Sequence, residues 1–578
     1  MWTKNSFQKM SFNDSLMNMP EYLKKILKDS WAYPFQKVIF PAISEDRFSV
    51  LYSDKPSRPN SPVNVIIGAL ILKEIFQLSD VELLGSIYFD DRFQYALRLT
   101  SEDKPPVSIN TFSNFRSRVY KYENETDKDL IKEEVENLSE LIAETLKIDN
   151  EKVRVDSFMV ASSSKNLSRI ELVYTVNANL IKKFNQLDKA SLPENCLSYL
   201  EKGHKNETIY KTRDKEADSK LEFLLKQSQM IYSAALKSTS KITETEEFKT
   251  LKRMLGEQID NDDFDNLDPA EIKAKDGKDL SSDILQNPSD PDATYRFKYG
   301  PNIGYTANVV EMFDDHNNII KSYDFKENIY SDQNFSNDTI KKLSKKTDPE
   351  NPIKMLVDGA YFTLDLAKKA LAKGIELIPG QLVGRKEDKS KLSYGITFKV
   401  NKDNLITGCI NNCKPFYSNY DEQKDVCTAK FSKEICSECN FKEKCRISFQ
   451  KKANTVRFNK SRYLRDIIRE KMNTDEYTEL TNQRAGVEGL PSVFRRFYNI
   501  DSMPVRGKIR SKFYFGFKVL ANNVKKLFKR PKIAIRWRLF LDYFVFYVVK
   551  NYFFENWNLI VFKYVWCFCV TINKFKKL

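Results

Sequence analysis

The chain has 578 residues, which is enough for two to four domains and at least one large hydrophobic core. Its 94 lysines and arginines outnumber its 79 acidic residues, and this net charge of +15 favours a phosphate-rich or acidic partner, although many solvated surfaces reach such a charge without binding nucleic acid. The two histidines argue against a histidine-based triad or multi-histidine metal site, and the lack of a GxxxxGK[ST] motif argues against chemistry driven by ATP hydrolysis.

The N-terminus and the cysteines both indicate an intracellular protein. Residues 1–20 contain no apolar stretch after a basic start, so we expect no secretory signal. Six of the nine cysteines fall within residues 409–445, unlike a disulfide framework spread along a secreted chain. We therefore expect a cytoplasmic protein in a reducing environment.

Residues 1–125 are expected to form an all-helical domain. Ser79 and Glu82 have the spacing of a capping box, and Asn110 is expected to cap a short basic helix over residues 108–122. Stacked short helices that end in a basic one are typical of a DNA-binding domain, and the alternative is an ordinary helical domain with a solvated face. Apolar residues at helical spacing precede the capping box: Val65, Leu70, Ile71, Ile75 and Leu78.

Residues 126–164 are expected to contain a connector helix and the first core strand. The connector helix is expected over 123–149, and the alternating, β-branched segment 152–163 predicts the strand. Residues 165–290 are polar, with apolar residues at helical spacing, and indicate a helical insertion between strands.

Residues 291–384 show the order strand, hairpin, strand, helix, strand, which predicts a mixed α/β sheet. The expected strands are 303–315, 318–327, 351–363 and 375–384, with a hairpin turn at Asp314–Asn318, and the expected helices are 337–347 and 364–374, the second closed by Gly374.

The remaining chain divides into three parts. Residues 385–450 form a cysteine-rich insertion, and residues 451–532 return to helix. Residues 533–578 form an aromatic tail, in which charged residues interrupt every long apolar run, so we expect no membrane span. Contact of this tail with a membrane or a partner stays open.

Three carboxylates stand out by position. Asp156 lies within the first strand, Asp358 ends a later strand, and Glu488 lies on a helix among arginines. Side chains at the carboxyl ends of neighbouring strands meet at one edge of a sheet, and such carboxylates suit hard divalent cations. The alternative is that each is an ordinary turn, cap or surface residue.

The segments around these carboxylates, "VRVDSFMVASS", "MLVDGAYFT" and "NQRAGVEGLPSVFRR", resemble in order the three motifs of DDE transposases from bacterial insertion sequences. Residues 290–314 and 506–527 resemble the same family, and the segment from residue 61 resembles its helical DNA-binding domain. The resemblance, which runs from about residue 60 to 530, implies an RNase H-like mixed sheet flanked by helices that uses two Mg²⁺ ions, or Mn²⁺, to cut and join DNA.

The resemblance also implies roles for individual residues. Asp156, Asp358 and Glu488 become the metal-binding catalytic triad, and Arg484 and Arg495 take the family's basic positions four residues before and seven after the glutamate. Two positions depart from the family pattern: Thr481 replaces a tyrosine, and Pro491 is expected to kink or end the helix and redirect Arg495. The expected DNA-binding residues are Arg484, Arg495, Arg496, Arg116, Arg118 and Lys525.

The cysteine-rich insertion suggests a structural zinc site. Cys436 and Cys439 have the spacing of a metal knuckle, and thiolates without histidine suit tetrahedral zinc. By resemblance the ligands are Cys409, Cys436, Cys439 and Cys445, with Cys413 or Cys427 as substitutes. The alternative is a degenerate knuckle or free buried thiols. Lysines on this insertion are further candidates for DNA contact: Lys430, Lys433, Lys442 and Lys444.

The sequence thus predicts a DNA transposase that cleaves transposon ends and transfers the strands into target DNA. Its partners would be double-stranded terminal inverted repeats and target DNA. By analogy we expect a homodimer in the DNA complex, a bacterial cytoplasmic location with nucleoid association when bound to DNA, and no nucleotide cofactor. Two alternatives stay open: a transposase-derived DNA-binding protein without catalysis, and a metal-dependent nuclease that does not join.

Overall fold

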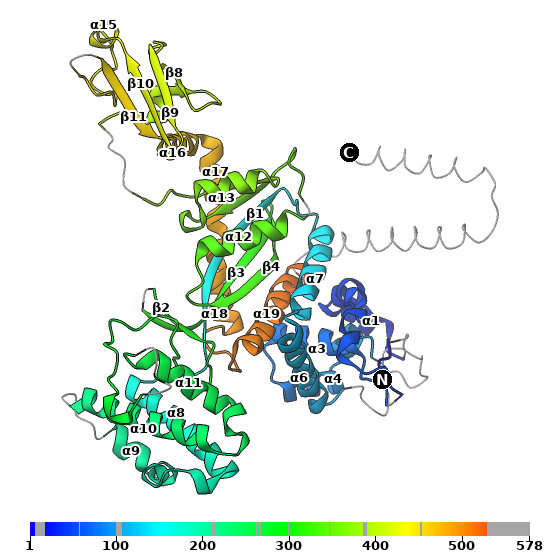
Figure 1. Cartoon of the computed structure of the whole chain (residues 1–578). Coiled ribbons are helices and arrows are strands. Elements are labelled where there is room, and N and C mark those ends of the chain that lie inside the picture. The colour runs from blue at the N-terminus through cyan, green and yellow to red at the C-terminus, as the bar shows by residue number, and fades with distance from the viewer. Residues whose placement is uncertain are drawn as a thin grey trace. The chain divides into compact units, whose positions relative to one another are not determined.

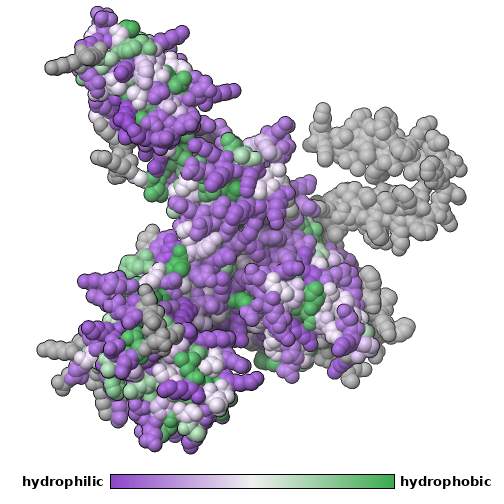
Figure 2. All heavy atoms as spheres, in the orientation of Figure 1, coloured by the Kyte–Doolittle hydropathy of each residue, from purple (hydrophilic) through white to green (hydrophobic). Residues whose placement is uncertain are grey.

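The computed structural model describes residues 1–5, 18–56, 58–99, 107–210, 216–261, 264, 267–298, 300–345, 347–384, 390–450 and 453–528. The aromatic tail 533–578 lies outside them. The chain divides into two compact units, one built from residues 1–69, 78–112 and the described residues from 524, the other from 70–77 and 113–523. Within the described ranges no helix combines the length and apolar character needed to cross a bilayer. Hydrophilic residues dominate the face of the molecule in Figure 2.

The N-terminal region is helical, as expected. The capping box is confirmed, because Ser79 Oγ accepts from the Glu82 amide at 3.2 Å and Glu82 Oε2 accepts from the Ser79 amide at 2.7 Å. Its elements are α1 (Glu21–Lys28), α2 (Ala32–Pro34), the π-helical turn η1 (Phe35–Ile39), the 3₁₀ turns η2 (Phe40–Ala42) and η3 (Asp46–Leu51), α3 (Val63–Phe76), α4 (Asp80–Phe89) and α5 (Asp91–Ala96).

The basic helix α6 spans Ile109–Thr126, so the expected cap at Asn110 is wrong. Asn110 lies inside the first turn, and the preceding Ser108 accepts from the Thr111 amide at 3.4 Å. Asp127, with a φ of 56°, then ends α6 before the connector helix α7 (Leu130–Leu146), which Asp129 caps. The expected single connector over 123–149 is therefore two helices.

The central sheet is mixed, as the sequence predicts, and Figure 1 shows β1, β3 and β4 side by side. β3 pairs antiparallel with β1, β2 and β4, whereas β5 runs parallel to β1 and β6 parallel to β5. The nearly continuous burial of β3 shows that both faces of the sheet are covered. The strands are β1 (Lys152–Ala161), β2 (Thr294–Phe297), β3 (Pro301–Phe313), β4 (Asn318–Glu327), β5 (Ile353–Val357) and β6 (Ile375–Pro379).

Several boundaries within the core differ from expectation. The helix expected over 337–347 is α12 (Asp332–Leu343), because Ser331 caps it by accepting from the Asn334 amide at 3.2 Å. β5 stops at Val357, since Asp358 already begins the 3₁₀ turn η10 (Gly359–Tyr361). The helix α13 (Leu364–Leu371) follows, and Gly374 has the positive φ of 72° expected after a helix end.

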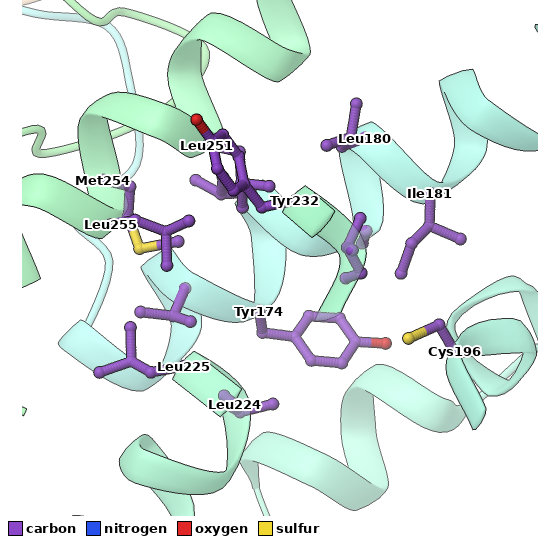
Figure 3. Close-up of a cluster of buried hydrophobic side chains, with 14 of the residues drawn as sticks. Tyr174, Leu180, Ile181, Cys196, Leu224, Leu225, Tyr232, Leu251, Met254 and Leu255 are labelled. Carbon is purple, nitrogen blue, oxygen red and sulfur yellow. The ribbon is translucent and has the colours of Figure 1, made fainter. Parts of the chain in front are cut away.

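The segment between β1 and β2 folds as a helical body with its own core, confirming its helical character. Aromatic and aliphatic side chains from α8, α10 and α11 meet there (Figure 3), and Tyr232 stacks on Phe248 with ring centroids 5.2 Å apart. Its elements are α8 (Arg169–Leu187), η4 (Lys189–Ser191), η5 (Glu194–Leu200), α9 (His204–Ile209), α10 (Ala217–Lys237), η7 (Lys241–Glu244), α11 (Glu246–Gln258) and η9 (Pro269–Glu271).

The cysteine-bearing segment forms a small β lobe that extends past the expected end at residue 450. β11 (Asn454–Asn459) pairs with β10 (Val426–Phe431), which pairs with β9 (Tyr417–Asp421). The core of this lobe holds Phe398, Phe431 and Phe458. Its other elements are α14 (Tyr394–Thr397), β7 (Phe398–Val400), β8 (Ile406–Cys409), α15 (Lys433–Ser437) and α16 (Lys460–Met472).

A buried asparagine joins the final helix, α19 (Lys508–Phe528), to the sheet. Asn523 accepts from the backbone amide of Ile320 on β4 at 3.1 Å and donates to the carbonyl of the same residue at 2.8 Å. It also donates to Ser139 Oγ on α7 at 2.9 Å. One amide side chain therefore satisfies the outer edge of β4 and holds two helices on the sheet.

We predict that Asn523→Ala lowers the free energy of unfolding of the second unit by roughly 2 to 4 kcal/mol, because it leaves the Ile320 backbone groups buried without partners. Chemical denaturation followed by circular dichroism would measure the change. Asn334→Ala, at an exposed asparagine of α12, is the control and should shift the free energy by less than about 0.5 kcal/mol. Equal stability of the two variants would contradict this role of Asn523.

Candidate active site

The pairing of β1 with β5 brings two of the three carboxylates near each other. Arg154 of β1 is level with Leu356 of β5 in a parallel pair. Asp156 and Asp358 each follow two residues after this pair, Asp358 just past the end of β5. The negative charge of Asp358 contributes to the raised pKa of Asp156, so the two carboxylates lie near each other.

Asp156 carries an energetic cost. Its environment removes much of its solvent, and this burial raises its pKa to about 6. The backbone amide of Ser157, which donates at 2.8 Å, and the positive charges of Arg484 and Lys298 act against the rise, while the negative charge of Asp358 adds to it. A carboxylate in this setting is short of positive charge and would gain from a bound cation.

Asp358 is fixed by the turn that follows β5. Its Oδ1 accepts from the Gly359 amide at 2.7 Å and lies 3.5 Å from Gln381 Nε2. A Cβ at Gly359 would lie 2.6 Å from the Gln381 carbonyl oxygen, so only glycine lets this turn pack against the end of β6. The Asp-Gly pair thus aims the carboxylate along the sheet edge.

Glu488 lies in a 3₁₀ turn, η11 (Gly486–Glu488), between α17 (Asp475–Ala485) and α18 (Gly489–Tyr498), so the helix expected to carry it is divided at this turn. The helical path tightens at Gly486, before Pro491, and α18 continues past the proline to Tyr498. Proline is tolerated there because the first turn of a helix needs no amide donor from it.

Arg484 connects this turn to the other carboxylates. Its Nη2 forms an ion pair with Glu488 Oε1, and its positive charge lowers the pKa of Asp156. The side chain lies against Gly380 after β6, where a Cβ would be 2.9 Å from Arg484 Nε. Arg484 therefore interacts with both Glu488 and Asp156, and links the two indirectly.

The other expected basic residues have different surroundings. Arg495 pairs with Asp501 at 3.3 Å, turned toward the end of its own helix, and Arg496 and Arg118 are exposed. The expectation that Arg116 binds DNA is corrected. Arg116 is only 8% exposed, and its guanidinium lies 5.5 Å from the centre of the Tyr514 ring, so it is poorly placed to reach a DNA phosphate. Lys525 is half-buried in the last turn of α19.

Five cysteines of the β lobe gather in one place. Burial raises the pKa of both Cys413 and Cys445, and so do three nearby thiols, those of Cys409, Cys436 and Cys439. Burial and the thiols of Cys409 and Cys439 likewise raise the pKa of Cys436. The expectation that Cys427 could substitute as a zinc ligand is corrected. Cys427 is buried in the core of the lobe, and its charged neighbours are Asp425 and Lys460. The described cysteines are unpaired. Lys430, Lys433, Lys442 and Lys444 are exposed on this lobe.

The donor chemistry of both clusters fits the metals that the sequence suggests, carboxylate oxygens for Mg²⁺ and thiolates for Zn²⁺. As the side chains stand in the described ranges, however, no three His, Cys, Asp or Glu residues are arranged to hold a metal ion. In the carboxylate cluster, Glu488 is paired with the guanidinium of Arg484.

Sequence reasoning missed two polar residues at the site. Lys298, on the hairpin after β2, is exposed and lowers the pKa of Asp156, and Gln381 reaches Asp358 from the end of β6. Lys298 sits in the basic, aromatic "YRFKYG" segment, and that composition was a usable signal. No sequence signal pointed to Gln381, because only the pairing of β5 with β6 brings it near Asp358.

We predict that Asp156→Asn stabilises the metal-free protein at pH 7 by roughly 2 kcal/mol. The folded-state pKa of about 6 exceeds that of an unfolded aspartate, so the ionised carboxylate destabilises the fold above about pH 6. The penalty disappears below about pH 4, where the carboxyl is protonated in both states, so the gain should fade between about pH 6 and 4.

Thermal unfolding in chelator across this pH range would test the prediction. Asp315→Asn, which changes an exposed aspartate in the β3–β4 turn, is the control and should show no such pH-dependent gain. A loss of stability in Asp156→Asn at pH 7 would show that the carboxylate is structurally required.

Two family models match the chain. A transposase domain (DUF772) matches residues 20–118, which covers the N-terminal helices, and a transposase DDE domain matches residues 409–528, which contains Arg484 and Glu488. No curated protein and no solved structure matches in the corresponding comparisons. The two matches agree in kind and in order with the resemblance of the sequence motifs. They show that the chain carries two transposase domains, which is consistent with an insertion-sequence DDE transposase.

Proposed function

We propose that this transposase cleaves DNA at the ends of a mobile element and joins the freed ends to target DNA, using Asp156, Asp358 and Glu488 as its metal-binding carboxylates. The observation that carries the proposal is the pairing of β1 with β5, which brings Asp156 near Asp358, together with the ion pair between Arg484 and Glu488. The raised pKa of Asp156 supports it, because stability alone does not favour such a carboxylate at this position.

The sheet supports an RNase H-like core. The path β4–β3–β1–β5–β6, with the first three strands antiparallel and the last two parallel to β1, is the strand order of that fold. Within this frame, the helical body would be an insertion after β1, and the cysteine-bearing lobe an insertion between β6 and α17. The helix after the lobe would then return to the catalytic edge of the sheet.

Mg²⁺ or Mn²⁺, bound as a pair, would supply an activated water and neutralise charge on the scissile phosphate. The protein's part is to present Asp156 in its ionised form, which prevails above about pH 6, next to Asp358. Glu488 would complete the set after its carboxylate leaves Arg484, a rotation that its exposed position in η11 permits.

Arg484, once released, is placed to bind a DNA phosphate beside the carboxylates, since a guanidinium matches phosphate in a bidentate geometry. The exposed Arg496 and Arg118 are further phosphate-binding candidates, and the partners would be double-stranded transposon ends and target DNA. A homodimer in the DNA complex is proposed only by analogy with other DDE transposases.

We predict that Asp358→Asn abolishes Mg²⁺-dependent cleavage of the element's end sequence and leaves DNA binding nearly unchanged. The loss should exceed the roughly 10- to 100-fold effect typical of residues that only support a metal ligand. Gel-based cleavage and a binding titration at fixed salt would measure the two properties. Asp365→Asn, at an exposed aspartate of α13, is the matched control.

The outcomes separate the candidate functions. Equal loss of cleavage and binding in Asp358→Asn would assign Asp358 a structural role. Binding without metal-dependent cleavage by the unmodified protein would favour a DNA-binding protein, and cleavage without joining to a second duplex would favour a nuclease.

We also propose that the cysteine cluster holds a structural Zn²⁺. Cys409, Cys436, Cys439 and Cys445 remain the preferred ligands, with Cys413 as the alternative fourth thiolate because it lies in the same cluster. Bound zinc would relieve the mutual repulsion of the thiolates and hold α15 and the following turn to β8.

We predict that the full-length protein purifies with about one zinc ion per chain, and that Cys436→Ser reduces this content well below one and lowers the melting temperature. Elemental analysis would measure the zinc content. Cys427→Ala is the control, because this thiol lies in the lobe core away from the cluster, and its zinc content should stay unchanged. A metal-free wild-type protein with an intact lobe would contradict the proposal.

A further inference from the structure

Arg154 is an unusual residue for the interior of a core strand. It lies on β1 two positions before Asp156, so both side chains project from the same face of the sheet, and it is only 7% exposed. Buried arginines are rare unless their charge and donors are satisfied. The partners of Arg154 therefore indicate why the residue is there.

The first partner fixes the guanidinium on the sheet. Arg154 Nε donates to Glu311 Oε2 at 2.5 Å, and Glu311 lies directly opposite on β3 and is 1% exposed. Asn318 donates to the other carboxylate oxygen at 2.7 Å, and the guanidinium stacks over the Phe313 ring at 4.6 Å from its centre. These contacts fix the plane of the guanidinium independently of the active-site turn.

The second partner belongs to the turn that carries Glu488. Arg154 Nη1 donates at 2.6 Å to the backbone carbonyl of Gln483, the residue before Arg484. The guanidinium also fills the space in front of Gly486, where a Cβ would lie 2.1 Å from Nη1 and clash. The absence of a side chain at Gly486 is thus what lets the turn rest on Arg154.

The rest of α17 is held further from the carboxylates. Tyr477 donates to the Pro379 carbonyl at 2.9 Å, and Leu480 packs with Phe313 and Ile378. Those contacts fix the start and middle of the helix but not its last turn. The hydrogen bond from Arg154 to the Gln483 carbonyl connects this last turn to the strand that bears Asp156.

We propose that Arg154 is a positioning residue, which uses its ion pair with Glu311 to dock the Gly486–Glu488 turn onto the catalytic strand and so sets the distance between Glu488 and Asp156. The inference rests on the proposed function in one respect, that Glu488 acts in catalysis. The competing explanation is an ordinary buried ion pair whose only role is stability.

The sharpest test uses the close approach at Gly486. Gly486→Ala should lower Mg²⁺-dependent cleavage by roughly 10- to 100-fold, because its Cβ displaces the turn from the guanidinium. Arg154→Lys should cause a similar loss and a higher half-saturating Mg²⁺ concentration, since an amine cannot reproduce both fixed donors. The double variant should be no worse than Arg154→Lys alone, because the clashing guanidinium is gone.

Gly489→Ala is the matched control. It places the same methyl group three residues further along the chain, where a Cβ meets no atom within 4 Å, and should leave cleavage within about twofold of the wild type. Losses that multiply in the Gly486→Ala and Arg154→Lys double variant would overturn the proposal, because independent defects would then be at work.

Amide hydrogen exchange of the metal-free protein provides a readout that needs no catalysis. Arg154→Lys should speed exchange in residues 483–489 by several-fold while β1 and β3 remain protected. Unchanged exchange in that segment, or equal loss of protection throughout the sheet, would overturn the positioning role. If instead Glu488→Gln leaves cleavage intact, the proposed function fails, while the exchange result still decides whether Arg154 docks the turn.

Discussion

The structure of the site depends on the parallel pairing of β1 with β5. This pairing brings Asp156 near Asp358, which follows the last residue of β5, and the repulsion between the two carboxylates is a cost that the fold has to offset. The cost is visible in the pKa of Asp156, about 6, which burial and the charge of Asp358 hold well above that of a free aspartate. A sheet selected for stability alone would place an apolar or uncharged residue there.

The positive charges around the site offset this cost in two distinct ways. Arg154 belongs to the scaffold, because its charge is cancelled by the buried Glu311 and its Nη1 donates to a backbone carbonyl. Arg484 and Lys298 act on the carboxylates themselves, and both lower the pKa of Asp156. Arg484 also pairs with Glu488, so the same cation interacts with two of the three carboxylates that we propose as metal ligands. Because Arg154 holds the strand separately, the release of Arg484 that we propose would leave the strand contacts in place.

The sequence predicted what depends on local pattern and strand order. Alternation around Val153 and Val155 located β1, the Asp314–Asn318 turn located the β3–β4 hairpin, and Ser79 with Glu82 located the start of α4. Motif resemblance supplied the three carboxylates. Errors arose where tertiary packing decides: Arg116 reads as a surface base on a basic helix but packs under Tyr514, and Cys427 reads as a ligand but fills a core. The local sequence does not indicate that either side chain is buried.

The turn at Glu488 shows how a distant strand shapes the proposed catalytic segment. Arg154 occupies the space that a side chain at position 486 would need. The chain has glycine at this position, and a 3₁₀ turn rather than an α-helix continues from it to Glu488. The buried arginine that shapes the turn comes from a strand more than three hundred residues earlier in the chain, and loop-closure entropy grows slowly enough with length for large insertions to separate the two. The geometry of the third carboxylate is therefore set by the first strand.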